Sequence, residues 1–164
     1  MLRRLCYYCA MTALRFANAT DIPFIMATER RPGYDVLVGR FEADVHRANL
    51  ADDSWLYFIG LDDRGTAQGF AILQDRNKED GAEFLRRIAV TNAGGGFGQL
   101  FLSALIDWVF THTEAQRFYL HVRNDNARAR HVYTLLGFVE EGPESDEEPD
   151  STTMGLSRAR WQAR

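Results

Sequence analysis

The order in which strand-like and helix-like segments follow one another is the strongest limit on the fold. Seven short apolar segments bounded by turn residues have the pattern of strands, and they are 13–16, 54–61, 66–74, 82–90, 116–123, 138–141 and 152–157. Four segments have helical spacing or caps, and they are 21–30, 35–49, 99–111 and 126–136. This alternation predicts an α/β fold with helices packed on a mixed sheet.

Length and charge narrow the function classes. A chain of 164 residues with 46% hydrophobic residues can form one domain with a buried core. Its apolar runs fall short of the roughly 18–20 residues that cross a bilayer. Seven carboxylates within residues 140–150 account for the formal net charge of −4, which would be +3 without them. Such a chain is not a typical nucleic-acid binder, so we expect no nucleic-acid or membrane partners. Two cysteines give no disulfide framework, as in a reducing cytosol, and we expect a cytoplasmic protein.

Residues 1–10 are expected to be an extension, and residues 11–164 a single domain. The extension holds both cysteines, Cys6 and Cys9. One C-x-x-C pair has too few ligands for a closed zinc site, so we expect no metal. Redox motifs of this type follow a strand, and no strand precedes this pair. The apolar stretch after Arg3 and Arg4 is short and interrupted, which argues against a signal peptide.

A glycine-rich loop at 93–98 is the sharpest local feature. Four glycines in five residues allow unusual backbone angles, so that N–H groups can converge on an anion. The N-terminus of the following helix adds a partial positive charge. The loop lacks the Gly-Lys pair of a P-loop and the G-x-G-x-x-G spacing of dinucleotide folds. It therefore suits another phosphate or pyrophosphate, unless it is only a flexible turn.

The predicted helix 126–136 carries a second feature. Asn126 is a good N-cap, and Tyr133 lies almost two turns later, about 10.5 Å along the axis. Both residues therefore point to one side of the helix. The Tyr133 hydroxyl can reach a ligand at the sheet edge, or else pack in the core with a nearby partner.

The short motifs occur in a specific order, and they are LRRIAV at 85–90, GGGFG at 94–98, LHV at 120–122, NARA at 126–129, VY at 132–133 and GF at 137–138. Together they resemble the GNAT superfamily of acetyl-CoA-dependent N-acetyltransferases, over about residues 83–156. The resemblance implies a mostly antiparallel sheet of six to seven strands with about four helices. Two features depart from the family. Ala93 stands where Arg or Gln is usual, and the link from Val90 to the glycines is about two residues short.

The resemblance also implies roles for individual residues. The acetyl-CoA-binding set consists of the backbone of Ile88, Ala89 and Val90 for the pantetheine, the loop Gly94, Gly95, Gly96, Phe97, Gly98 and Gln99 for the pyrophosphate, and Asn126 with Tyr133. The Val90 N–H would meet the oxyanion. The phenol of Tyr133, with a usual pKa of about 10, would protonate the leaving thiolate as general acid.

Two residues compete for the role of general base. The family position for a strand glutamate is Phe84, and Glu83, one residue away, faces the other side unless the strand carries a bulge. His121, on the adjacent predicted strand, has a suitable usual pKa of about 6.5. A water chain without a dedicated base is the third alternative.

The expected function is transfer of an acetyl group from acetyl-CoA to a primary amine of a small molecule or peptide, by direct attack in a ternary complex. The resemblance implies an acceptor pocket formed by residues 30–35 and the acidic segment, whose carboxylates could concentrate cationic amines or only aid solubility. The resemblance implies exposed sheet edges and a splayed sheet, which favour a homodimer. The alternatives are a non-catalytic acyl-CoA-binding or sensor module on the same fold, and a partner-binding protein without a nucleotide.

Overall fold

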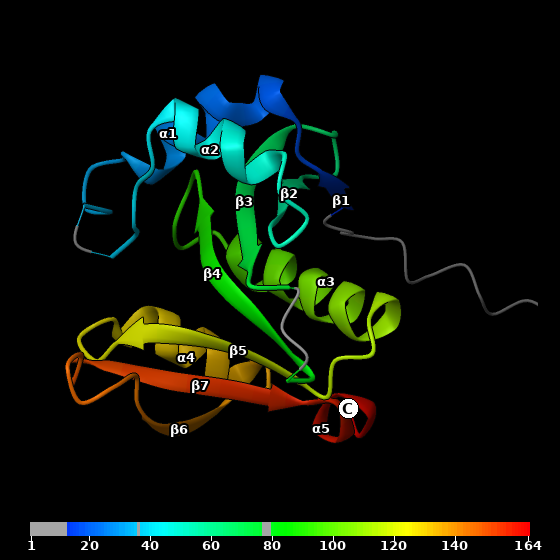
Figure 1. Ribbon diagram of the computed structural model, residues 1–164, viewed down its shortest axis with the longest axis vertical. Coiled ribbons are helices and arrows are strands. Elements are labelled where there is room, and N and C mark those ends of the chain that lie inside the picture. The colour runs from blue at the N-terminus through cyan, green and yellow to red at the C-terminus, as the bar shows by residue number, and fades with distance from the viewer. Residues whose placement is uncertain (1–12, 36, 77–79) are drawn as a thin grey trace, which may run out of the picture.

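The computed structural model describes residues 13–35, 37–76 and 80–164. Over these residues seven strands form one sheet in the order β1-β2-β3-β4-β5-β7-β6 (Figure 1). The strands are β1 (Ala13–Phe16), β2 (Leu56–Leu61), β3 (Ala67–Gln74), β4 (Ala82–Val90), β5 (Arg117–Arg123), β6 (Val139–Pro143) and β7 (Ser151–Ser157). Neighbours are antiparallel except β4 and β5, which are parallel. The predicted mixed, mostly antiparallel sheet is confirmed.

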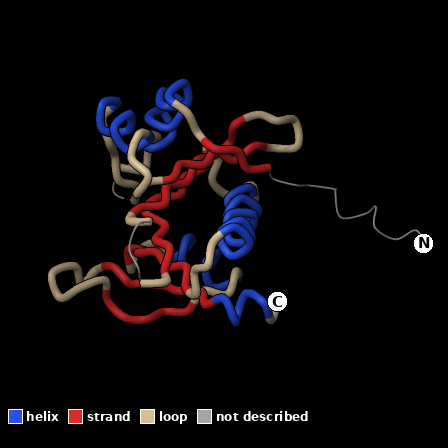
Figure 2. Tube along the Cα trace, turned by 45° about the vertical axis from the view of Figure 1, so that its right-hand side comes forward, coloured by secondary structure: helices blue, strands red, loops and turns tan. Residues whose placement is uncertain are grey.

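The helices cover both faces of this sheet. They are the short 3-10 turn η1 (Ala19–Asp21), α1 (Ile22–Glu29), α2 (Ala43–Leu50), α3 (Phe97–His112), α4 (Ala127–Leu135) and α5 (Arg158–Gln162). Figure 2 shows α1 and α2 on one face and α3 on the other. Helix α4 packs on the same cluster as α3, through Ala129 and Val132. Helix α5 was not predicted.

Two hydrophobic clusters, one on each face, hold the layers together. On the α1 face, Ile25 packs with strand residues that include Ile59 and Phe70. On the other face, α3 buries one side, including Leu105 and Val109 at 0% exposure, whereas Leu100 is 47% exposed. That burial is worth about 1.5–3 kcal/mol per large side chain.

Strands β4 and β5 pair only at their beginnings and then diverge (Figure 1). The last paired residues are Leu85 and Leu120. A bulge follows immediately, because Ile72 of β3 faces Arg87 while the next residue faces Leu85, which leaves Arg86 as the extra residue. A bulge bends its strand and increases the local twist. The end of β4 therefore has an open edge toward β5, called the β4–β5 gap below.

The largest error of the sequence prediction lies before α2. The helix begins at Ala43, not at residue 35. Two contacts hold the preceding segment against β4 instead: the Tyr34 hydroxyl donates to the Val90 carbonyl, and Arg87 lies over the Phe41 ring. A side chain at Gly39 would approach Arg87 within 2.5 Å. These contacts outweigh the weak helical preference of the segment.

Three further points concern the end of α4, the N-terminal extension and membrane-spanning helices. Gly137, which follows α4, has φ of +95°, a left-handed conformation that glycine adopts without strain. The extension at residues 1–10, with its cysteines, lies outside the described residues. In the described ranges, no helix combines the length and apolar character needed to span a membrane.

Candidate active site

The open edge of β4 exposes backbone hydrogen-bonding groups to the β4–β5 gap. The Thr91 N–H donates to the Gln68 carbonyl at 2.8 Å, so Thr91 directs its backbone groups toward β3. These groups alternate along a strand, and those of Ile88 and Val90 therefore point into the gap. The Tyr34 hydroxyl, 2.8 Å from the Val90 oxygen, approaches from this side. Ala89 directs its backbone groups toward β3 and contributes to the site only as part of the cavity wall.

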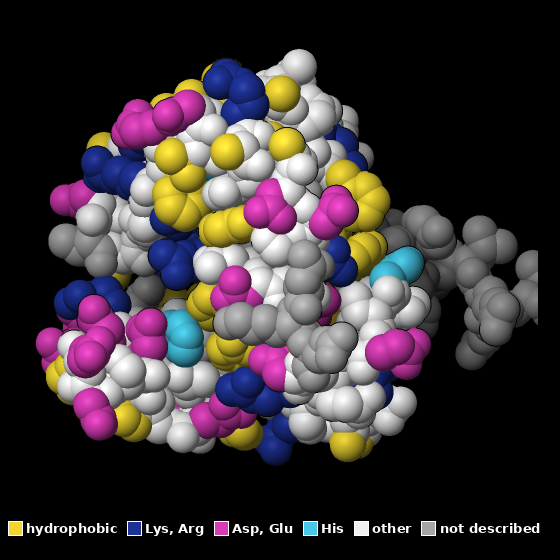
Figure 3. Space-filling model, in the orientation of Figure 1, with side chains coloured by type: hydrophobic (Ala, Val, Ile, Leu, Met, Phe, Trp, Pro, Cys, Tyr) yellow, Lys and Arg dark blue, Asp and Glu magenta, His cyan; other side chains and the backbone are white. Residues whose placement is uncertain are grey.

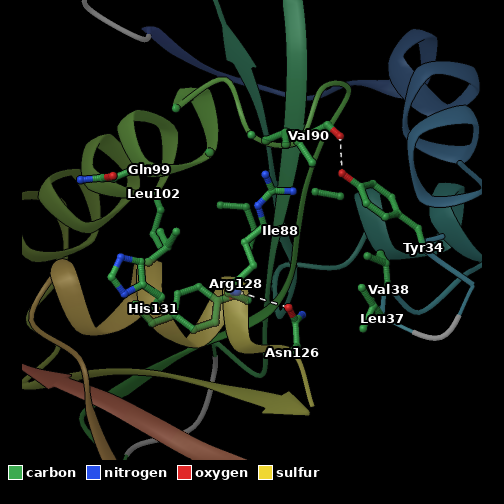
Figure 4. Close-up of a pocket in the computed structure, with 18 residues that line it drawn as sticks. Tyr34, Leu37, Val38, Ile88, Val90, Gln99, Leu102, Asn126, Arg128 and His131 are labelled. Atoms are coloured by element: carbon green, nitrogen blue, oxygen red, sulfur yellow. Dashed lines mark hydrogen bonds between the residues drawn. The ribbon is translucent and has the colours of Figure 1, made fainter. Parts of the chain in front are cut away.

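A cavity of about 430 Å³ lies at this edge (Figure 4). It gathers most of the residues predicted to bind the cofactor, and these are Ile88, Ala89, Val90, Gly94, Gly96, Gly98, Gln99, Asn126 and Tyr133. Gly95 and Phe97 are not part of its lining. The Phe97 ring packs on Phe101 instead, with centroids 5.8 Å apart.

The glycine loop has the backbone conformation that its composition predicted. Gly94 and Gly96 have φ of +93° and +83°, which side-chain-bearing residues rarely adopt. Gly96 is also the N-cap of α3, so the loop leads directly into the positive end of that helix. A side chain at Gly96 would meet no protein atom within 4 Å.

Arg128 brings a positive charge to the same loop. A Cβ atom added at Gly94 would lie 2.5 Å from Arg128 Nη2, so the guanidinium reaches the loop from α4. Figure 4 shows this side chain rising from α4 into the cavity. Arg128 was not among the predicted site residues. Its position could have indicated a role in the site, because Arg128 lies only two residues after the N-cap Asn126, which was itself a predicted site residue.

Asn126 and Tyr133 lie on the same side of α4, as their spacing predicted. The Asn126 side-chain oxygen accepts from the Ala129 N–H at 3.2 Å, which caps the helix (Figure 4). The Tyr133 hydroxyl has no hydrogen bond to any residue that the structure describes. Burial raises the pKa of Tyr133 to about 12. The phenol therefore keeps its proton at neutral pH and is open to a ligand.

A second, smaller cavity of about 150 Å³ adjoins the first. Five residues line both cavities, and they are Leu37, Val38, Ile88, Asn126 and Tyr133. The other side chains around the smaller cavity are mostly charged or polar, including Arg86, Arg87, Arg123, His121 and Glu144. Two molecules bound in these cavities would meet at Tyr133.

Comparisons with known proteins identify the family of this chain. The profile of the acetyltransferase (GNAT) family matches residues 22–138. The chain belongs to the GNAT family. It is 31% identical to a spermidine N(1)-acetyltransferase of Vibrio cholerae over 100 residues, which is 60% of this chain and 58% of that protein. The match thus spans little more than half of that relative's length.

Solved structures share the fold of this GNAT chain. The spermidine N-acetyltransferase from Vibrio cholerae in complex with CoA and spermine superposes with a TM-score of 0.81 at 22% identity, over 93% of this chain and 98% of that one. A dodecameric structure of spermidine N-acetyltransferase from Vibrio cholerae gives a TM-score of 0.75 at 21% identity, over 92% and 96% of the two chains.

The two base candidates of this GNAT chain lie in different places. Glu83 lines neither cavity, is 6% exposed and lies 3.4 Å from Arg76. Burial raises its pKa, although the charge of Arg76 opposes the change. Strand β4 does carry a bulge, at Arg86, and Phe84 lies beside His121 with ring centroids 5.0 Å apart. The adjacent Glu83 consequently faces away, and the structure does not bring it to Tyr133.

His121 lies in the smaller cavity together with Tyr133. Its Nδ1 is 3.0 Å from the Thr153 hydroxyl, and its Nε2 is 3.9 Å from a carboxylate oxygen of Glu144. Burial lowers the pKa of His121, a change that the charge of Glu144 opposes and that of Arg86 assists. The imidazole is therefore largely neutral at pH 7 and can accept a proton.

The buried carboxylate of Glu29 holds Arg87, which lines the smaller cavity. Glu29 is fully buried and lies 2.9 Å from His46 Nε2 and 3.1 Å from Arg87 Nη1. It also accepts from the Phe41 N–H and from Arg30. This cluster ties α1, α2 and the segment between them to β4. The sequence analysis did not identify it, because its members are far apart in the chain.

Proposed function

We propose that this GNAT protein transfers an acetyl group from acetyl-CoA to a primary amine by direct attack in a ternary complex. One observation carries the proposal: a large cavity beside the glycine loop and a small charged cavity share Tyr133 and the end of β4. Donor and acceptor could therefore occupy separate spaces and meet at one hydroxyl. A direct transfer needs such an arrangement, because both substrates must be bound together.

Acetyl-CoA fits the larger cavity chemically. The glycine loop, the start of α3 and the guanidinium of Arg128 form a cationic site that suits a pyrophosphate. The gap-facing backbone groups of Ile88 and Val90 suit an amide-containing arm bound like an additional strand. Bound acetyl-CoA would supply an activated thioester carbonyl. Ala93 stands where the family usually has Arg or Gln. Arg128, which reaches the same loop from α4, supplies a positive charge there.

The residues around the junction fit the proton transfers of this reaction. A protonated amine is not nucleophilic, and the neutral imidazole of His121 can accept its proton, directly or through water. The Val90 N–H, which faces the gap, can donate to the oxyanion. The Tyr133 phenol can donate its proton to the leaving thiolate, and its raised pKa ensures that it carries that proton.

Assembly and location are further parts of the proposal. The edge strands β1 and β6 are largely exposed, and Phe16 is 57% exposed, so a second copy could pair there. We propose a homo-oligomer, in the simplest case a dimer, and a cytoplasmic location. The dodecameric Vibrio cholerae relative supports assembly in general. Sedimentation at a mass above the 18.7 kDa of one chain would support it, whereas a monomer at all concentrations would contradict it.

Thiol release measured with acetyl-CoA and a panel of amines, beginning with spermidine, tests the activity. We expect turnover with at least one amine and a loss of roughly a hundredfold in kcat for Tyr133→Phe, with the Kd for CoA unchanged. CoA binding without thiol release from any amine would overturn the proposal in favour of a sensor module. An unchanged kcat for Tyr133→Phe at saturating substrates would reject the general-acid role.

A further inference from the structure

The charges around the smaller cavity identify the class of amine that it would accept. Three arginines line this cavity, Arg86, Arg87 and Arg123, but Glu144 is the one carboxylate in its described lining. Figure 3 shows basic and acidic side chains gathered around a hollow at the left of this face, where β4 and β5 diverge in Figure 1. The partners of each charged group decide which charges remain for a ligand.

Two of the three arginines are already paired within the protein. Arg87 is bound to the buried Glu29 at 3.1 Å and lies 3.8 Å over the Phe41 ring. Arg123 binds Asp125 through two hydrogen bonds of 2.9 and 3.0 Å. Their positive charges are thus largely balanced before a ligand enters.

Arg86 is different, because it has no hydrogen bond or ion pair with any residue that the structure describes. Its side chain is exposed, whereas that of Arg87 is buried. It is the extra residue of the β4 bulge, and a bulge can direct two consecutive side chains to one face. Its charge also reaches His121, whose pKa it helps to lower. An uncompensated cation therefore stands beside the candidate base.

The acidic segment supplies less negative charge here than its composition suggested. Glu140 is paired with Arg130 and Glu141 with Arg117, away from the cavity. Glu144 alone reaches the lining, 3.9 Å from His121. The free charges around the cavity are thus one cation, Arg86, and one anion, Glu144.

From this arrangement, and on the basis of the function proposed above, we propose that the acceptor is a small amino-acid-like amine with a carboxylate close to its amine. Arg86 binds the carboxylate, and the amine lies at Glu144 and His121, within reach of Tyr133. A guanidinium matches a carboxylate with two parallel hydrogen bonds. A polyamine, which carries several positive charges and no negative one, would be repelled by Arg86 and would find a single free carboxylate in the lining.

The test compares matched amines in the thiol-release assay. The twenty common L-amino acids are measured beside their α-amides, which keep the amine and lose the carboxylate, and beside spermidine. We expect kcat/KM for the best amino acid to exceed that for its amide and for spermidine by about tenfold or more. An amide as good as its acid, or spermidine better than every amino acid, would overturn this inference while leaving the acetyltransferase function intact. Thiol release from no amine would overturn both.

Variants of Arg86 assign the preference to that residue. Arg86→Ala should raise KM for the best amino acid about tenfold, and its kcat/KM should fall about tenfold more for the amino acid than for the amide. Arg86→Lys should restore part of the loss. Activity with the amide reports whether each variant is folded, and Arg64→Ala, in the distant β2–β3 turn, is the matched control. Equal losses with acid and amide in Arg86→Ala would refute the role.

Discussion

The hydroxyl of Tyr34 donates a hydrogen bond of 2.8 Å to the carbonyl oxygen of Val90. This bond joins the segment between α1 and α2 to the last residue of β4. Val90 is also the residue whose N–H faces the β4–β5 gap. One contact therefore links the segment before α2 to the backbone that is proposed to meet the oxyanion.

Replacing Tyr34 by Phe should lower the free energy of unfolding by about 1 kcal/mol, because one neutral hydrogen bond is lost. Urea denaturation at pH 7 measures the change. Tyr133→Phe is the matched control, since it removes the same atom from a phenol that has no protein partner among the described residues. Equal midpoints for the wild type and Tyr34→Phe would contradict a stabilising role for the bond.

Gly96→Val should abolish CoA binding. The residue has φ of +83°, which valine resists, and its added side chain would project into space that the proposed pyrophosphate needs. Gly65→Val is a close control, because Gly65 has φ of +77° and equally open surroundings but lies in the β2–β3 turn. Both variants should lose stability. In calorimetric titration only Gly96→Val should lose CoA affinity, and retained affinity would place the phosphates elsewhere.

Glu29→Gln should destabilise the fold by about 3 kcal/mol at pH 7, because it leaves Arg87 buried without its charge partner. Burial by itself would raise the pKa of Glu29, but hydrogen bonds from His46 and Phe41 and the charge of Arg87 outweigh it and lower the pKa below 4.5. The stabilisation is therefore present above the unfolded-state value and is lost as the pH falls through the folded-state pKa.

The difference in unfolding free energy between wild type and Glu29→Gln should accordingly shrink when urea unfolding is repeated below pH 4. Glu42→Gln provides the comparison. Glu42 also binds Arg30, but its side chain is 76% exposed, so its loss should cost less than about 1 kcal/mol. Equal losses of unfolding free energy in Glu29→Gln and Glu42→Gln would show that burial does not determine how much each carboxylate stabilises the fold.

His121→Gln should lower kcat by roughly a hundredfold if the imidazole takes the proton of the amine. Burial keeps the pKa of His121 below its usual 6.5, so the neutral base persists below that pH. In the wild type kcat should therefore begin to fall only below pH 6.5. His112→Gln, on the exposed side of α3, controls for loss of a histidine. If the pH dependence of kcat is unchanged in His121→Gln, a water chain and not His121 accepts the proton of the amine.

The sequence predicted most strands within two residues, because turn residues and alternating apolar residues are local signals. The general base was harder to predict, because the side to which Glu83 points depends on the bulge at Arg86. No turn residue or break in the local sequence marks that bulge. The segment before α2 was predicted as helix because its contacts with β4 involve residues 56 positions away, such as Tyr34 with Val90. Arg128 could have been found from its place in the first turn of α4.

The divergence of β4 from β5 leaves the sheet incomplete. Ile88 and Val90 have hydrogen-bonding groups that no neighbouring strand uses, so a ligand bound there supplies part of the secondary structure. Any such ligand stabilises the folded chain by mass action, by about 2.7 kcal/mol at a concentration one hundred times its Kd. The melting temperature of this protein should thus report how much donor is available to it, and starvation for the donor would weaken the fold together with the chemistry.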